Sequence, residues 1–533
     1  MGALNRASVE ARSLVAMFRS GALTLESPRR TLRAIRALNQ YGPFGAASQI
    51  ATIHHGDEPA INDEAGEITY AELDELTNRL ANAFTDRGLE AGSKIGILCR
   101  NHRFPLMAAF AASRAGISAV WLNTAFSARQ MKEVAEREGV ELLVHDAEFN
   151  EDVGGIDLRF GRMVCLSEEA DPDDIELAMA ASGATMPPVP DKPGRIVLLT
   201  SGTTGTPKGA PRPEPRSLSI AGAVMERMPM KRREATVIGP PIFHGVGLLI
   251  ALLSISLGSK LVLRRGFTPE QMLDDIETHH ATTVCVVPVM LQRILALGDE
   301  EIGSHDLSSV RAIFCAGSAL PGDVAIRAMD ELGDVVYNLY GSTEVSVATF
   351  ATPADIRRSP TTVGKTALGS RVRILDAAGD PSPPGETGRV FVGAISPFEG
   401  YTGGGGKEII DGLLSSGDLG HFDEEGFLFI DGRDDEMIVS GGENVFPHEV
   451  EEILITHPAI DDAAVIGVDD EEFGQRLRAF VVCPEDDAPT ESDVQEFVKS
   501  NLARYKSPRD VIFMDELPRN PTGKILKRKL PAD

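Results

Sequence analysis

A ten-residue stretch from Thr200 to Gly209 carries the residue types that bind phosphate groups. It reads T-S-G-T-T-G-T-P-K-G, with three glycines, five hydroxyl side chains and Lys208. Glycine lets the backbone wrap closely around an anion, N–H and hydroxyl groups donate to phosphate oxygens, and a lysine adds positive charge. By composition alone, the same stretch also fits a flexible, solvated loop.

The stretch differs from the common nucleotide-binding loop, which ends in Gly-Lys-Ser/Thr. Here Pro207 stands directly before the lysine. A second glycine-rich run, Gly403 to Lys407, fails the same test, because Tyr401 occupies the place of its first glycine and Glu408 follows the lysine. The sequence therefore predicts a phosphate cradle of another kind at 200–209.

Two further segments offer side chains suited to a nucleotide. Asn338 to Glu344 reads N-L-Y-G-S-T-E. The Tyr340 ring can stack on a base, Thr343 offers a hydroxyl to a phosphate, and the Glu344 carboxylate is an oxygen ligand of the kind that Mg²⁺ prefers beside phosphate. In the second segment, G-L-L-S-S-G-D-L-G at 412–420, an aspartate is ordinarily a turn residue, but its carboxylate can accept two hydrogen bonds.

The hydrophobic pattern places these segments on alternating strands and helices. Residues 195–199 predict a buried strand that feeds the phosphate-binding stretch, and three prolines between 211 and 215 delay the next helix to about Ser217. Between 67 and 145, predicted strands alternate with helices: strands at 67–70, 94–98, 118–122 and 141–145, helices at 70–87, 104–115 and 127–139. Such alternation indicates parallel sheets covered on both faces.

In their order along the chain, these segments resemble the adenylate-forming enzymes, which include acyl-CoA synthetases, aryl-CoA ligases, luciferases and peptide-synthetase adenylation domains. The resemblance covers about residues 50 to 530 and includes the carboxy-terminal lysine motif at 518–524, P-R-N-P-T-G-K. It implies an α/β fold: a large N-terminal domain of stacked α/β sheets and a small α+β C-terminal domain joined by a hinge. We expect an extension at 1–45, a catalytic domain at 46–434 and a mobile domain at 435–533.

The resemblance also implies roles for individual residues. Adenine is expected at the small residues that end the predicted strand at 313–320, the ribose hydroxyls at Asp418, the ribose and phosphate at Arg433, and the hinge at Asp435. Phe243 and His244 are expected at the wall of the acyl pocket, followed by a helix that lines it. The implied catalytic residues are Lys524, His244, Glu344 and Thr343, with Glu344 also the metal ligand. The implied residues for ATP and coenzyme A are Thr200, Ser201, Gly202, Thr203, Thr204, Gly205, Thr206, Lys208, Gly317, Ser318, Ala319, Tyr340, Gly341, Asp418, Arg433, Gly441 and Gly442.

Some of these residues also have ordinary structural interpretations, and at some positions the sequence departs from the family pattern. A lone histidine is more often structural than catalytic, and most lysines, here Lys527 and Lys529, are solvated surface residues. Leu413 stands where family members often have an aromatic residue. The basic neighbours usual for the hairpin at 439–445 are absent, so phosphate contacts to coenzyme A come from elsewhere.

Composition and charge exclude some classes of function and indicate the cellular compartment. The chain has 533 residues, 42% of them hydrophobic, and a net charge of −27, which disfavours nucleic-acid binding. Its five cysteines lack metal-ligand spacing and predict buried, reduced thiols and a cytoplasmic protein. The sequence contains neither a signal peptide nor an apolar run of transmembrane length. The sequence does not indicate an oligomeric state.

The first 40 residues differ from the rest, because they carry seven arginines and two glutamates. Two amphipathic helices are expected, one with Leu14, Val15, Met17 and Phe18, the other starting at Ser27–Pro28 with Leu32, Ile35 and Leu38. One interpretation is peripheral contact with an anionic membrane. The other is an extension packed on its own catalytic domain or on a partner subunit.

The resemblance implies an AMP-forming acid–thiol ligase that uses ATP, Mg²⁺ and coenzyme A. The small residues at 245–247 and the uncharged segment around them favour a medium- or long-chain fatty acid, and thus fatty acid metabolism, over an amino acid. Two alternatives stay open: an acyl-AMP ligase that loads a carrier protein, and a CoA ligase for aryl or other acids. A nucleotide-binding protein with an inactive site is disfavoured by intact Lys524, Glu344, Asp418 and Lys208.

Overall fold

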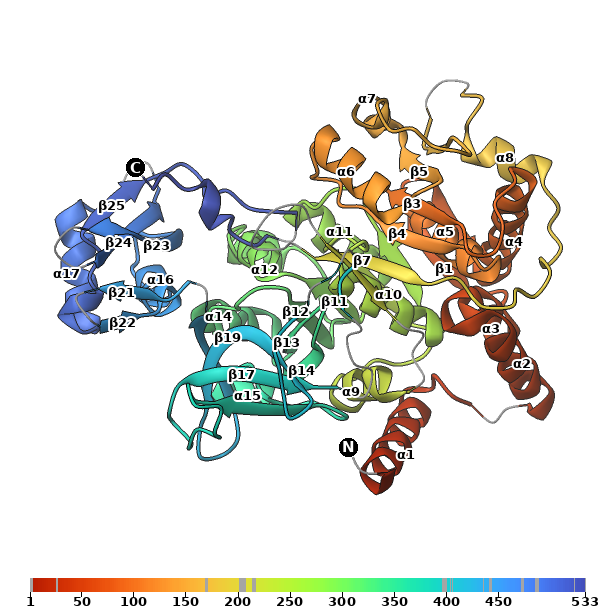
Figure 1. The fold of residues 1–533 in the computed structure, drawn as a ribbon. Helices are drawn as coiled ribbons and strands as arrows, with labels where there is room; N and C mark the ends of the chain where they lie inside the picture. Colours follow the sequence, from red (N-terminus) through yellow and green to blue (C-terminus); the bar gives the residue numbers. More distant parts are fainter. Residues whose placement is uncertain are drawn as a thin grey trace.

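The computed structural model describes residues 3–24, 27–167, 171–200, 208–212, 217–394, 400–402, 404, 406–434, 436–440, 443–470, 474–484, 488–521 and 523–532. Figure 1 shows a large body that carries most of the chain and a smaller C-terminal unit beside it, as the sequence predicts. Within the described ranges, no helix combines the length and the apolar character needed to cross a bilayer. All five cysteines are free thiols, and Cys483 is the one that is partly exposed.

The two ends of the predicted phosphate-binding stretch, at Thr200 and Lys208, belong to a six-stranded sheet in the order β6-β5-β3-β4-β7-β8. Five strands run parallel and β8 pairs antiparallel with β7 at the edge. The strands are β3 (Lys94–Leu98), β4 (Ser118–Trp121), β5 (Leu142–Asp146), β6 (Arg162–Cys165), β7 (Ile196–Thr200) and β8 (Lys208–Arg212). Their helices are α4 (Tyr70–Asp86), α5 (Arg103–Arg114), α6 (Ala128–Glu138), α7 (Asn150–Val153) and α8 (Ile175–Ala181).

Helices α4, α5 and α6 begin and end within about a residue of the predicted bounds, whereas α7 and α8 were not predicted. Thr69 and Ser127 cap α4 and α6 by capping boxes with Glu72 and Gln130, and Gly139 ends α6 in the left-handed conformation. Tyr70, which the predicted strand and the predicted helix share, is the first residue of α4; its buried hydroxyl donates to the Ser259 carbonyl.

A nine-stranded sheet lies beside the first, in the order β15-β14-β13-β12-β11-β9-β10-β1-β2. Its strands are β1 (Pro59–Asp63), β2 (Gly66–Thr69), β9 (Ala235–Ile238), β10 (Lys260–Leu263), β11 (Thr283–Val286), β12 (Ala312–Ala316), β13 (Val336–Ser342), β14 (Ser346–Ala351) and β15 (Lys365–Thr366). Its helices are α3 (Ala47–His55), α9 (Ser219–Arg227), α10 (Gly245–Ser256), α11 (Pro269–His279), α12 (Pro288–Leu295), α13 (Asp299–Gly303), α14 (Gly322–Leu332) and α15 (Pro353–Arg358). One hydrophobic core runs through both sheets, with α5 between β3–β4 and β1.

A five-stranded antiparallel sheet completes the large body and carries Asp418 and Arg433. Its strands are β16 (Arg371–Leu375), β17 (Gly388–Gly393), β18 (Ile409–Ile410), β19 (Leu413–Phe422) and β20 (Leu428–Arg433). Asp418 therefore lies inside strand β19 and not at a tight turn. Gly417, with a φ of 85°, stands beside it, and the register between β19 and β20 shifts nearby.

The C-terminal unit is the small α+β unit that the sequence predicts. It consists of β21 (Ile438–Ser440), β22 (Glu443–Val445), β23 (Asp462–Asp470), β24 (Gly474–Val482), β25 (Asp510–Phe513), α16 (Pro447–Ile455) and α17 (Glu491–Asn501). β21 and β22 form the expected hairpin, whose residues Gly441 and Gly442 lie outside the described ranges. The predicted hinge residue Asp435 also lies outside the described ranges. The domain boundaries at 45 and 434 stay predictions.

The N-terminal helices form as predicted, as α1 (Ala3–Ser20) and α2 (Pro28–Gly45). α1 packs on α9, and α2 packs on α3 and α5 (Figure 1). Ser27 holds the N-cap position of α2 without a capping bond from its side chain, and the helix kinks at Gly42, next to Pro43. The interpretation of an extension packed on its own catalytic domain is thus confirmed for one face of each helix.

Candidate active site

The phosphate-binding stretch connects the edge hairpin β7–β8. Thr200 is the last residue of β7 and pairs with Lys208, the first residue of β8. The residues between them, which include the predicted donors Ser201, Gly202, Thr203, Thr204, Gly205 and Thr206, lie outside the described ranges. Lys208 is exposed, and its Nζ lies 5.5 Å from the centre of the Tyr401 ring.

Tyr401 reaches this hairpin because its segment crosses β8. The Thr402 N–H donates to the Gly209 carbonyl at 2.8 Å, and a Cβ on Gly209 would lie 2.5 Å from the Thr402 hydroxyl oxygen. A side chain at position 209 would therefore push the segment away. The Tyr401 hydroxyl donates to Glu344 Oε1 at 2.8 Å, so this one ring links the phosphate-binding lysine to the predicted metal ligand.

Glu344 and Thr343 lie in the tight turn that joins β13 to β14. Ser342 donates to Glu344 Oε2 at 2.8 Å, which, with the bond from Tyr401, orients the carboxylate. Gly341 is required here, because a Cβ would lie 1.9 Å from the Ser346 carbonyl oxygen. A single oriented carboxylate fits Mg²⁺, which takes one or two carboxylates and completes its shell with phosphate and water oxygens.

The predicted ribose site forms around Asp418. Arg433 Nη1 donates to Asp418 Oδ1 at 2.8 Å, and the Tyr340 hydroxyl donates to Asp418 Oδ2. Burial, together with the Asp418 charge, raises the pKa of Tyr340 well above its ordinary value, so the phenol keeps its proton. Each carboxylate oxygen keeps acceptor capacity for a ribose hydroxyl. The structure thus brings Tyr340, Asp418 and Arg433 together from three strands.

The predicted adenine turn and the C-terminal lysine motif both lie next to the side chain of Val287. Gly317, Ser318 and Ala319 follow β12 at the surface, and Gly317 has a φ of 101°, a conformation that favours glycine. A Cβ on Gly317 would lie 3.4 Å from Val287 Cγ1, and one on buried Gly523 would lie 3.4 Å from Val287 Cγ2. The segment before Lys524 is therefore seated beside the adenine turn, and Lys524 itself is exposed there.

Two hydrogen bonds between Asn520 and Lys524 stabilise the Lys524 turn. The Asn520 N–H donates to the Lys524 carbonyl at 2.9 Å, and the Lys524 N–H donates to Asn520 Oδ1 at 2.9 Å. Lys527, expected at the solvated surface, is instead largely buried between Glu436 and Glu451, at 3.0 and 2.8 Å. Burial alone would lower the pKa of Lys527, but these two carboxylates raise it above its usual range.

His244 holds the N-cap position of the apolar helix α10 without a capping bond from its side chain, and it lies against Phe243, with ring centroids 4.6 Å apart. Burial lowers the pKa of His244 to about 4, so the imidazole is neutral at pH 7. Among the described residues, its Nε2 has no hydrogen-bond partner although the atom is buried. A buried polar atom without a partner is costly unless a ligand satisfies it, which favours the functional interpretation of His244 over the structural one.

Asn101 fixes the segment that leads to His244. Its Nδ2 donates to the Pro240 carbonyl at 3.0 Å, and its Oδ1 accepts from the Ile242 N–H at 2.8 Å. Asp146 holds the neighbours of Asn101 by accepting from the Arg100 N–H at 2.9 Å and from His102 Nε2 at 2.7 Å. The buried side chains of Asn101 and Asp146 therefore hold the segment predicted to form the wall of the acyl pocket.

Sequence analysis missed Tyr401 and Asn101 as parts of the site. In the sequence, Tyr401 stands out only because it breaks a glycine pattern, and no motif given above includes Asn101. Both act on partners more than 50 residues away in the chain. No local spacing signals such pairs, although a buried asparagine after a strand does indicate a satisfied polar network.

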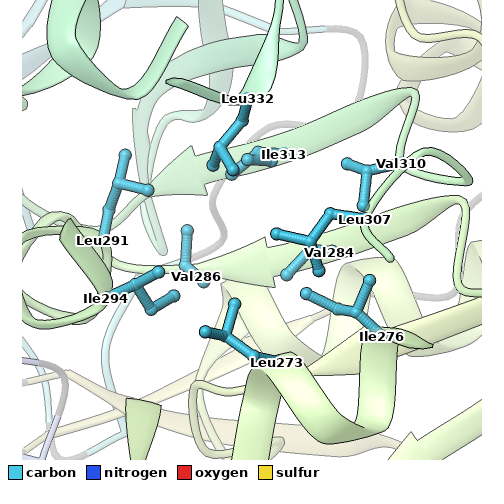
Figure 2. Close-up of a pocket in the computed structure, with 10 residues that line it drawn as sticks. All are labelled: Leu273, Ile276, Val284, Val286, Leu291, Ile294, Leu307, Val310, Ile313 and Leu332. Atoms are coloured by element: carbon cyan, nitrogen blue, oxygen red, sulfur yellow. The ribbon is translucent and has the colours of Figure 1, made fainter. Parts of the chain in front are cut away.

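Figure 2 shows an internal cavity that is distinct from this site. It lies between β11–β12 and helices α11, α12 and α14, and its lining consists of Leu273, Ile276, Val284, Val286, Leu291, Ile294, Leu307, Val310, Ile313 and Leu332. Because every lining residue is aliphatic, the cavity offers no group that would orient a carboxylate or a phosphate. It is a packing void of the core.

Comparison with known proteins agrees with this geometry. Residues 49–402 match the family model described as AMP-binding enzyme, and residues 449–524 match that of the AMP-binding enzyme C-terminal domain. A feruloyl-CoA synthase of Amycolatopsis sp is 32% identical over 86% of this chain and 92% of its own length. A fatty acid–[acyl-carrier-protein] ligase of Streptomyces coeruleorubidus is 30% identical over 90% and 93%. The o-succinylbenzoate CoA synthetase of Bacillus subtilis, solved with its acyl-adenylate, superposes with a TM-score of 0.78 at 25% identity, covering 91% and 97%.

Proposed function

Since the chain belongs to the AMP-binding enzyme family, we propose that it joins a carboxylic acid to coenzyme A through an acyl-adenylate, and that the acid is a medium- or long-chain fatty acid. The observation that carries the reaction is that strand β13 connects the groups of residues in the candidate site. Tyr340 of β13 contacts Asp418, Glu344 follows the strand and contacts Tyr401, and Ala316, which precedes the predicted adenine turn and the neighbouring Lys524 segment, pairs with Leu339 of the same strand. Each group supplies what one part of ATP requires.

In the first step, a carboxylate oxygen attacks the α-phosphorus of ATP, the bond to the β-phosphate breaks, and pyrophosphate leaves. The reactants are both anions, so charge neutralisation matters more than proton transfer. Lys208 and Lys524 offset the developing charge, while Asp418 and Tyr340 hold the nucleoside. Glu344 is the residue that would hold Mg²⁺, which when bound neutralises phosphate charge.

In the second step, the thiol of coenzyme A attacks the acyl carbon, a C–S bond forms, the C–O bond to AMP breaks, and the thiol proton leaves to solvent. We propose that the C-terminal domain turns about Asp435 between the steps. The turn withdraws Lys524 and brings the β21–β22 hairpin, with Gly441 and Gly442, to the thiol. Loop segments between compact units commonly absorb such motions.

The proposed acid follows from the uncharged surroundings of the reaction region. One apolar cluster joins α9, α10 and the β13–β14 hairpin through Ile220, Ala223, Leu249, Leu339, Val347 and Leu368. A small pocket at this cluster has no charged lining residue; it is lined by Ser219, Ile220, Ala223, Ser346, Val347, Leu368, Gly369, Ser370 and Ala394. The apolar cluster offers no charged partner for the ammonium group of an amino acid, which favours an alkyl chain.

The activities of the relatives suggest the competing proposals. A feruloyl-CoA synthase and an indoleacetate–CoA ligase point to aromatic acids, and the carrier-protein ligase points to another acceptor. A mass-spectrometric product assay with Mg-ATP and straight-chain or aromatic acids, with and without coenzyme A, separates them. Acyl-CoA formed only from straight-chain acids is expected. Preference for aromatic acids, or acyl-AMP that ignores coenzyme A, would overturn the proposed acid or the proposed acceptor respectively.

A further inference from the structure

The N-terminal helices expose apolar side chains on the faces that point away from the body. In the described part of the chain, six of the eleven exposed large hydrophobic side chains lie between residues 14 and 38. They are Leu14 (40% exposed), Val15 (49%), Phe18 (45%), Leu32 (67%), Ile35 (50%) and Leu38 (42%). Exposed apolar residues gathered in this way mark an interaction site. We call these six residues the N-terminal apolar face.

Helix α1 has two apolar sides, and only one of them is used for packing. Val9, Ala16 and Met17 are buried. Polar contacts to the start and end of α9 fix this side: Arg12 Nη2 lies 2.7 Å from Glu226 Oε1, and Ser217 and Leu218 donate to the Glu10 carboxylate. At 3.6 residues per turn, Leu14, Val15 and Phe18 then lie on the opposite side.

Helix α2 repeats this arrangement. Ala37 and Tyr41 are buried, and the Tyr41 hydroxyl donates to the Pro187 carbonyl at 2.9 Å. Leu32, Ile35 and Leu38 recur every three residues on the side opposite Ala37. Arg29, Arg33 and Arg36, which recur every three or four residues, line one edge of this apolar strip.

The charge of these helices identifies the partner. The first 40 residues hold seven arginines and two glutamates, although the whole chain carries −27. Helix α2 contains no acidic residue, and the Glu10 carboxylate of α1 is engaged by α9. Apolar side chains flanked by arginines fit the boundary of an anionic bilayer, where the former enter the acyl region and the latter pair with phosphate. A symmetric contact with a second copy would instead set arginines against arginines.

We propose that the N-terminal apolar face and its arginines dock the enzyme on anionic lipid bilayers. Figure 1 shows α1 and α2 on the large body, with the C-terminal unit at the other end of the molecule. Docking would leave that unit free to turn. It would also place the membrane beside α1 and its partner helix α9, which contributes Ile220 and Ala223 to the apolar cluster shared with α10. The docking itself does not depend on which acid is used.

The test is cosedimentation of the full chain with vesicles of phosphatidylcholine alone or with about one third phosphatidylglycerol. We expect binding to the anionic vesicles that weakens as salt rises, and at least about tenfold weaker binding to the neutral ones. The triple variant Arg29→Gln, Arg33→Gln, Arg36→Gln should bind the anionic vesicles roughly 100-fold more weakly. The variant Leu32→Gln, Ile35→Gln, Leu38→Gln should lose binding to a similar degree.

Matched controls carry the same changes elsewhere on the surface. Arg129, Arg159 and Arg373 are exposed arginines outside the face, and Leu177 and Val189 are exposed apolar residues outside it. Their glutamine variants should bind vesicles like the parent. Equal binding by all variants, or no binding to anionic vesicles by the parent, would overturn the proposal. The proposal would also be overturned if the parent did not bind vesicles but instead self-associated or bound an acidic protein, and if the α2 variants abolished that association.

Discussion

The hydroxyl of Tyr401 donates a 2.8 Å hydrogen bond to Glu344, and the same ring lies beneath the Lys208 ammonium group at 5.5 Å. Two residues 57 positions apart in the chain are thus joined, and the Tyr401 ring contacts both the Glu344 carboxylate and the Lys208 cation. Burial and the nearby Glu344 charge raise the pKa of Tyr401, which keeps the hydroxyl a donor.

Tyr401→Phe should slow adenylate formation about tenfold, because a hydrogen bond to a charged carboxylate is lost while the ring remains. Glu344→Gln should slow it more, since the proposed metal ligand loses its charge. Pyrophosphate release, measured at several magnesium concentrations, reports both effects. Tyr505→Phe, at an exposed tyrosine of the C-terminal unit, is the control. An unchanged rate in Tyr401→Phe would contradict a role for this bond.

Lys524→Ala should slow the formation of acyl-AMP about 100-fold, because a cation beside the transferred phosphate is lost. Thioester formation from supplied acyl-AMP should stay within about twofold of the parent, because the lysine withdraws before that step. Single-turnover assays of each half-reaction measure the two rates. Lys529→Ala, at an exposed lysine nearby, should change neither. Equal losses in both half-reactions would sink the assignment of Lys524.

The depressed pKa of His244 gives a pH dependence with a defined sign. The unfolded chain binds a proton at about pH 6.5, whereas the folded protein does so at about pH 4. The unfolded state therefore binds more protons between these values, and the stabilisation present above pH 6.5 is lost as the pH falls toward 4. His244→Gln should lose less of its free energy of unfolding over this window. Denaturant titrations across it would contradict the account if both proteins declined in parallel.

The fold was largely predictable because its helices and strands follow local rules. Hydrophobic period predicts α4 and α6 to within a residue or two, and the structure shows that capping boxes at Thr69 and Ser127 fix where these helices start. The five-stranded sheet around Asp418 was not predicted, because its strands pair residues that are distant in sequence. For the same reason Asp418 was assigned to a turn, and Lys527, now paired with Glu436 and Glu451, to the surface.

The candidate site was predictable where a motif is contiguous, as at Asn338 to Glu344. It was not predictable where one side chain serves a distant backbone, as Asn101 does for Pro240 and Ile242. Such contacts depend on which strands become neighbours. Neither hydrophobic period nor residue spacing carries that information.

The central claim is that the acid is activated as an acyl-adenylate, and the fate of a carboxylate oxygen tests it most directly. A fatty acid labelled with oxygen-18 in both carboxylate positions is incubated with the enzyme, Mg-ATP and coenzyme A, and the AMP is analysed by mass spectrometry. The account predicts one labelled oxygen in AMP, because the carboxylate bonds to the α-phosphorus and the later thiol attack breaks the C–O bond. Unlabelled AMP, or label in pyrophosphate or phosphate, would contradict it.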